Sequence, residues 1–197
     1  MNLAEATIVR RLERDLQLRF IAEARSIAEQ SRLFRPQAGG RPMSVKITNA
    51  GALGWVADEL GYRYTSAHPR TGRPWPPIPQ WWLDFADDVA GREPWDCAHL
   101  IWYEPGASLG WHRDKTERTR RPIVTLSLGD DATWAVRLDE REPIHRARLY
   151  SGYTTLLSGE TRDALHSIEA IEPAPALLAP SPLPTPGRLA ISIRVAG

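Results

Sequence analysis

The sequence predicts an α+β fold that is mainly β, of the antiparallel sandwich or jelly-roll type, with helices before the strands. Three observations lead to this prediction. From residue 98 onward, seven short segments of β-type composition follow one another, separated by turn residues and without a helical pattern. Residues 4–30 instead carry apolar side chains at helical spacing. Residues 35–80 are dense in proline and glycine.

Length and composition describe an ordinary globular chain. The 197 residues suggest one domain, and hydrophobic residues make up 42% of them. The net charge of +1 does not by itself indicate a nucleic-acid-binding protein. We find no apolar run long enough for a membrane span and no apolar signal segment near the N-terminus, so we expect a cytoplasmic protein without a membrane partner. The single cysteine, Cys97, fits a reducing compartment and is expected to be a small buried side chain.

The first expected element is a packing helix over residues 4–30, within an N-terminal helical segment assigned to residues 1–34. Its charged face carries Arg10, Glu13 and Arg14. Its apolar face is formed by Ile8, Leu12, Leu16, Phe20, Ala24 and Ile27.

Residues 35–97 are expected to form an ordered but irregular segment followed by a second helix. The turn-rich part interleaves Trp55, Tyr62, Tyr64 and Trp75 with arginines, a composition that suits packing and also suits stacking on a nucleotide strand. The helix is expected in "IPQWWLDFADDVAG", which has proline near its start and Gly91 after its end.

Residues 98–197 are expected to form the β-rich core. The proline-rich stretch 174–187 is expected to be an internal loop, because six prolines counted from residue 173 exclude a central strand and a strand follows it. The expected strands are "AHLIWYE", "PIVTLSLG", "TWAVRL", "HRARLY", "YTTLLSG", "ALHSIEAI" and "RLAISIRVA".

The segment "GWHRDKT" contains two candidate metal ligands, His112 and Asp114. In extended chain, residues two apart point to the same side, so both side chains can reach one ion. Two histidines and one carboxylate form the facial set of oxygen-activating Fe(II) enzymes. The second histidine is either His166, inside a predicted strand, or His145, among charged residues. We favour His166.

The last predicted strand, "RLAISIR", places Arg188 and Arg194 six residues apart and therefore on one face. Between them on that face are only Ala190 and Ser192, whereas the opposite face is wholly apolar. Inward-facing arginines require anionic partners, and the gap between these two suits a short dicarboxylate.

Taken together, the motifs resemble those of the AlkB family of Fe(II)/2-oxoglutarate-dependent dioxygenases. The resemblance covers most of the chain from about residue 40, through "SVKITNAGALGW", "GYRYTSAHPRTGRPWPPIPQ", "YEPGASLGWHRDKTE", "PIVTLSLG", "SGETRDALHSI" and "RLAISIR". It implies a double-stranded β-helix, a jelly-roll type, preceded by a nucleotide-recognition lid in residues 35–97. It also implies Fe(II), 2-oxoglutarate and O2 as cofactors.

The resemblance implies a role for each matching residue. His112, Asp114 and His166 would bind iron. Arg188 and Tyr103 would hold the distal carboxylate of 2-oxoglutarate, and Arg194 would reach its metal end and orient Asp114. The residues expected near the substrate are Trp55, Trp111 and Thr116 at the base, Tyr62 at a phosphate, and Arg113 and Lys115 as further phosphate contacts.

Three positions depart from the family pattern. Ile101 and Ala190 stand where the family often has asparagines that help to hold 2-oxoglutarate, and the loss of two hydrogen bonds would weaken that binding. Thr116 stands where an acidic residue often contacts the base, which opens the question of base preference.

The function expected from the resemblance is oxidative demethylation of N-alkylated bases, such as 1-methyladenine or 3-methylcytosine. The substrate would be single-stranded or flipped-base DNA, with RNA as a second polymer, and the products would include formaldehyde and succinate. We expect a monomer. Two alternatives stand beside this reading: the same chemistry on tRNA, protein or a small molecule, and a non-catalytic metal- or nucleic-acid-binding module.

Overall fold

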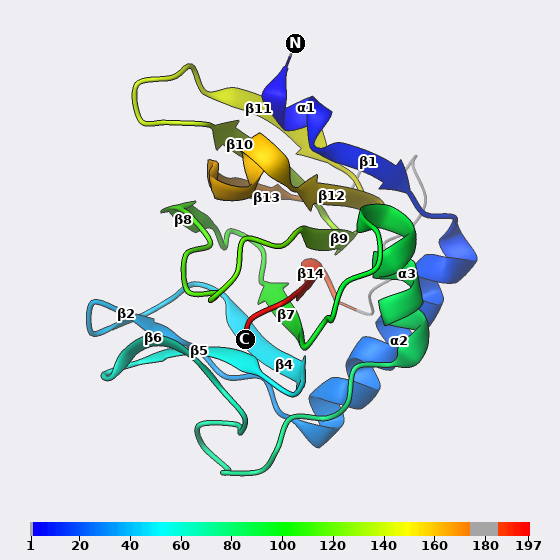
Figure 1. Ribbon diagram of the computed structural model, residues 1–197, viewed down its shortest axis with the longest axis vertical. Coiled ribbons are helices and arrows are strands. Elements are labelled where there is room, and N and C mark those ends of the chain that lie inside the picture. Colours follow the sequence, from blue (N-terminus) through cyan, green and yellow to red (C-terminus); the bar gives the residue numbers. More distant parts are fainter. Residues whose placement is uncertain (1, 174–184) are drawn as a thin grey trace.

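The computed structural model describes residues 2–173 and 185–197, and two antiparallel sheets form most of it (Figure 1). The larger sheet consists, in spatial order, of β1 (Ile8–Arg11), β12 (Tyr153–Leu157), β9 (Ile123–Gly129), β14 (Arg188–Arg194), β7 (Cys97–Tyr103) and β4 (Lys46–Gly51). The smaller sheet consists of β11 (His145–Leu149), β10 (Asp131–Arg137), β13 (Leu165–Glu172) and β8 (Leu109–His112). The predicted mainly β jelly-roll fold is confirmed.

Three helices and two short hairpins complete the described chain. The helices are α1 (Leu3–Ala6), α2 (Arg14–Gln30) and α3 (Gln80–Ala90), and a 3-10 turn, η1, spans Gly159–Asp163. The hairpins pair β2 (Gln37–Ala38) with β3 (Arg41–Pro42) and β5 (Gly54–Asp58) with β6 (Gly61–Thr65). We call residues 54–65 the lid hairpin. No helix of the described residues is both long and apolar enough to cross a membrane.

Strand β14 lies inside the larger sheet and has two differently used faces. Its odd-numbered residues Leu189, Ile191 and Ile193 pack in the core cluster that also contains residues of α2 and α3. Figure 1 shows these two helices side by side along one flank of the molecule. The even-numbered residues point to the other side, toward a pocket between the sheets. The expected division of this strand into an apolar face and a face that carries Arg188 and Arg194 is found, and a function of the second face stays a prediction.

The expected single helix over residues 4–30 is wrong, because the chain forms α1, then β1, then α2. The Thr7 hydroxyl donates to the Ala4 carbonyl at 2.7 Å and ends α1. Strand β1 then adds to the sheet edge beside β12, and the Leu12 amide donates to the Gly152 carbonyl at 2.8 Å. Sheet pairing with a distant strand therefore overrides the apparent helical spacing at Ile8. The expected apolar face is retained in α2, where Phe20, Ala24 and Ile27 are buried.

The irregular structure expected over residues 35–80 is also wrong in part, because this segment contains β2 to β6. Strand β4 pairs with β7, which lies about fifty residues further along the chain, so the local sequence pattern does not predict this strand. Strand β8, which carries His112, was not among the expected strands either. Both strands of the lid hairpin are short and begin with a glycine, Gly54 or Gly61, and these features resemble loop chemistry in the sequence.

The other expected elements are found. Helix α3 begins after Pro79 and ends at Gly91, whose φ of 87° suits glycine, and it buries Trp82 and Phe85. All seven strands expected after residue 97 form, and Cys97 is fully buried. Most of the expected proline-rich loop, residues 174–184, lies outside the described residues.

Candidate functional site

A pocket of about 360 Å³ opens between the two sheets and is bordered by the lid hairpin. Alternate residues of β7, β13 and β14 point into it, and all four residues of β8 border it. Every residue that the sequence assigned to metal, cosubstrate or base, and also Tyr62, lines this one pocket. Those residues are His112, Asp114, His166, Tyr103, Arg188, Arg194, Trp55, Tyr62, Trp111 and Thr116.

The three candidate metal ligands converge in this pocket. Strands β8 and β13 are paired so that His112 lies opposite His166, and their ring centroids are 4.2 Å apart. The Nε2 atom of His166 is 3.6 Å from Oδ2 of Asp114. One ligand atom from each of the three residues lies within 4.8 Å of the other two, which suits a single metal ion. His145 is excluded from this cluster by its place on β11, which β10 and β13 separate from β8.

Backbone carbonyls orient both candidate histidine ligands. Nδ1 of His112 lies 2.8 Å from the Gly110 carbonyl, and Nδ1 of His166 lies 3.0 Å from the Ala164 carbonyl. Because a carbonyl only accepts, each Nδ1 donates its proton and each Nε2 keeps its lone pair for a metal. Burial lowers the pKa of His166 to about 4, so its imidazole is neutral at pH 7. Both rings are therefore ready to ligate.

Arg194 holds the third candidate ligand in an ionised, oriented state. Its Nη1 donates to Oδ1 of Asp114 at 3.0 Å. Burial would raise the pKa of Asp114, but Arg194 and the two histidines lower it well below its usual range. The carboxylate is thus available for a cation at any ordinary pH.

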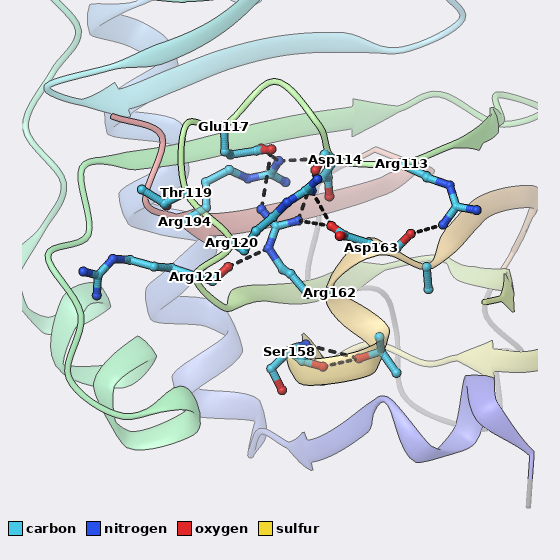
Figure 2. A network of polar contacts seen from close by, with 12 residues as sticks. Arg113, Asp114, Glu117, Thr119, Arg120, Arg121, Ser158, Arg162, Asp163 and Arg194 are labelled. Carbon is cyan, nitrogen blue, oxygen red and sulfur yellow. Dashed lines mark hydrogen bonds and ion pairs between the residues drawn. The ribbon is translucent and has the colours of Figure 1, made fainter. Parts of the chain in front are cut away.

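Glu117 is a member of this site that the sequence analysis missed. It accepts a hydrogen bond from Arg194 at 2.7 Å and another from the hydroxyl of Tyr64, on β6 of the lid hairpin, at 2.6 Å. Its side chain is only 1% exposed. Figure 2 shows Glu117 and Asp114 on either side of the Arg194 guanidinium. The position directly after Thr116 was the available signal, because an acid was expected one residue earlier.

Arg162, in η1, was also missed, and it holds the loop that carries Asp114 and Glu117. It donates to the Asp114 carbonyl at 3.1 Å and to the Arg121 carbonyl at 2.6 Å, and its guanidinium lies 3.5 Å from Glu117 (Figure 2). Only 3% of its side chain is exposed. Two arginines from distant segments therefore fix Asp114, one through the side chain and one through the backbone.

Arg188 lies deep in the pocket with incomplete hydrogen bonding. It donates to the Ser127 hydroxyl at 2.8 Å, and its guanidinium carbon is 4.9 Å from the centre of the Tyr103 ring. Its Nε and Nη1 are buried without a hydrogen-bond partner among the described residues. A buried guanidinium with free donors fits a carboxylate ligand, and the nearby Ile101 and Ala190 supply only apolar wall.

Aromatic side chains form the outer wall of the pocket. The rings of Trp55 and Tyr62 stack at 5.6 Å with an interplanar angle of 25°. Trp111 lies under the Arg137 guanidinium, 5.0 Å from its carbon, and Thr116 reaches the same pocket. These three rings and the Thr116 hydroxyl all line the same pocket.

The two basic residues that were predicted to contact phosphate differ in their availability. The guanidinium of Arg113 donates to the carbonyls of Leu138, at 3.0 Å, and Asp163 (Figure 2). Lys115 is exposed. The side chain of Arg113 thus has partners inside the protein, whereas Lys115 is open to solvent, and a phosphate contact of either one stays a prediction.

Comparison with known proteins agrees with this geometry. Residues 7–194 match the model of the 2OG-Fe(II) oxygenase superfamily. The chain is 38% identical over 160 residues to an alpha-ketoglutarate-dependent dioxygenase AlkB homolog of Caulobacter vibrioides, covering 80% of this chain and 71% of that protein. It is 34% identical over 178 residues to the dioxygenase AlkB of Escherichia coli, covering 86% and 82%. The tRNA demethylase abh1 of Schizosaccharomyces pombe is 29% identical over 145 residues, covering 68% and 47%. The fold is shared with the solved structure of OsALKBH1, at a TM-score of 0.81 over 95% of both chains and 22% identity.

Proposed function

Because the chain belongs to the AlkB family of the 2OG-Fe(II) oxygenase superfamily, we propose that it demethylates N-alkylated bases in nucleic acid. The proposed substrates are 1-methyladenine and 3-methylcytosine in single-stranded or flipped-base DNA, with RNA as a second polymer. The observation that supports this proposal is a single pocket that contains the His112–Asp114–His166 cluster, the incompletely hydrogen-bonded Arg188 and an aromatic wall.

The residues present fit the cofactors that the family implies, Fe(II), 2-oxoglutarate and O2. The His–Asp–His donor set suits Fe(II) and leaves room for further ligands. The free donors of Arg188 suit the distal carboxylate of 2-oxoglutarate, and Tyr103 lies beside them. When bound, the iron and its cosubstrates supply the oxidising power that removes a methyl group as formaldehyde.

The protein's own part in the proposed reaction is to hold and orient. Arg194 keeps Asp114 charged and aimed at the metal position, while the two backbone carbonyls keep the histidine lone pairs there. Trp55 and Trp111 offer flat surfaces on which an unstacked base can rest beside the metal. Lys115 lies close in sequence to Asp114 and is exposed, which suits contact with the strand that carries the base.

The relatives support a nucleic acid substrate without selecting the polymer. Proteins described as AlkB dioxygenases, a tRNA demethylase and an N6-methyladenosine RNA demethylase are all similar to this chain. Thr116 at the base-facing position keeps modified tRNA as a second candidate substrate.

The test is a demethylation assay with Fe(II), 2-oxoglutarate, O2 and short DNA or RNA oligonucleotides that each carry one methylated base. Mass spectrometry follows the base, and formaldehyde and succinate are measured in parallel. His112→Ala should abolish turnover, whereas His145→Ala, a histidine outside the cluster, should leave it unchanged. Succinate formation without demethylation of any base would reject the nucleic acid substrate and retain the oxygenase. No succinate under any condition would favour a non-catalytic module.

A further inference from the structure

His99 is a buried histidine in the pocket wall that has no part in the metal cluster or at Arg188. It lies on β7, opposite Asn49 on β4 and Ser192 on β14, and only 7% of it is exposed. Its ring meets the ring of Trp55 edge to face at a centroid distance of 5.5 Å. It also interacts electrostatically with Asp114 and Arg194. The imidazole therefore lines the same pocket as the metal cluster and contacts Trp55 of its aromatic wall.

The backbone of the lid hairpin fixes the orientation of Asn49. The Asn49 amide nitrogen donates to the Trp55 carbonyl at 3.0 Å, and its Oδ1 accepts from the Trp55 amide at 3.2 Å. This paired contact leaves only one orientation for the side-chain amide, because a reversed amide would face donor to donor and acceptor to acceptor.

The orientation of Asn49 in turn fixes the proton on His99. Nδ1 of His99 lies 2.8 Å from Oδ1 of Asn49, and since that oxygen only accepts, Nδ1 must donate. Burial, together with the nearby Arg194, lowers the pKa of His99 to about 3, so the ring is neutral and carries a single proton. Nε2 therefore carries a bare lone pair, and no described residue donates a hydrogen bond to it.

We propose that His99 is a specificity-determining residue, whose Nε2 accepts a hydrogen bond from the exocyclic amino group of the methylated base. The lone pair attracts an amino group and repels a carbonyl oxygen at the same place on the ring. The pocket should thus prefer 3-methylcytosine to 3-methylthymine, and 1-methyladenine to 1-methylguanine. The same lone pair disfavours a carboxylate, so we assign His99 to the base and not to 2-oxoglutarate. Thr116 does not make this selection, since its hydroxyl can either donate or accept.

This inference rests on the proposed function, and two variants of His99 test it. His99→Leu removes the acceptor. His99→Gln keeps one, because its amide nitrogen can donate to Asn49 and leave its oxygen toward the pocket. The assay measures kcat/KM on two single-stranded oligonucleotides that differ only in carrying 3-methylcytosine or 3-methylthymine, with circular dichroism as a check on folding. We expect His99→Leu to lower the cytosine-to-thymine ratio by about tenfold and His99→Gln to restore most of it.

The possible results separate this inference from the proposed function. A His99→Leu protein that is active with an unchanged ratio overturns the role of His99 and leaves the demethylase function intact. A wild-type protein that demethylates neither oligonucleotide, nor any other methylated base, overturns both.

A second measurement needs neither activity nor a folded leucine variant. In 15N spectra of histidine-labelled wild-type protein at pH 7, His99 should show a protonated Nδ1 and an unprotonated Nε2, assigned by its absence from the His99→Gln spectrum. A protonated Nε2 would overturn the proposal.

Discussion

The hydroxyl of Tyr64 links the lid hairpin to the charged network beneath it, and its removal should destabilise the protein measurably. In Tyr64→Phe, the 2.6 Å hydrogen bond to Glu117 is lost while the ring stays. Glu117 would keep Arg194 as its partner on the same oxygen. Its side chain is 1% exposed, so water cannot readily replace the lost donor.

The expected magnitude follows from the charge of the acceptor. A hydrogen bond to a charged group contributes about 1.5–3 kcal/mol to the free energy of unfolding. For a chain of this length, that loss corresponds to a fall in Tm of about 3–12 °C. Thermal and urea unfolding of the metal-free protein measure it directly, because no ligand then contributes to stability.

Tyr62→Phe is the matched control. It deletes the same hydroxyl two residues earlier on β6, from a side chain that is 56% exposed and for which no hydrogen bond is found among the described residues. Its stacking on Trp55 does not need the hydroxyl. We expect a change within about 0.5 kcal/mol. If both variants lose the same stability, the link between Tyr64 and Glu117 is not the stabilising contact that we infer.

Three further predictions concern cosubstrate binding, pH and the lid. Arg188→Met should leave the metal-free protein as stable or more stable, because an incompletely paired buried charge is removed. It should also abolish the rise in Tm that 2-oxoglutarate causes in the wild-type protein. A retained rise would contradict the assignment of Arg188 to the carboxylate of 2-oxoglutarate. Burial lowers the pKa of His99 to about 3 and that of His166 to about 4, below their value of 6.5 when unfolded, so the unfolded chain binds protons first. The free energy of unfolding should therefore fall from pH 6.5 toward pH 4, by up to about 1.4 kcal/mol per pH unit for each histidine, and urea titrations of His99→Gln should show a shallower slope. Gly54→Ala should destabilise the lid hairpin, because a Cβ there would lie 2.5 Å from the Trp75 ring, and limited proteolysis should detect the change.

The features that could be predicted from the sequence are those to which a short-range rule applies. The period of two along a strand placed Arg188 and Arg194 together on the functional face of β14, and put His112 and Asp114 within reach of one ion. Prediction from the sequence was wrong where strand pairing is non-local. Ile8 has helical spacing but lies in a strand at a sheet edge, and β4 pairs with a strand that is far along the chain.

The sequence by itself determined the chemistry that the pocket can hold: the His–Asp–His ligand types, the two inward arginines and the aromatic side chains near the entrance. Only the tertiary structure decided how these groups are supported. Glu117 between Tyr64 and Arg194, and Asn49 fixing the proton of His99, are contacts between segments separated by as many as 77 positions. A hydrogen bond requires approach to about 3 Å, and distance along the chain carries no information about it until the register between the sheet strands is known.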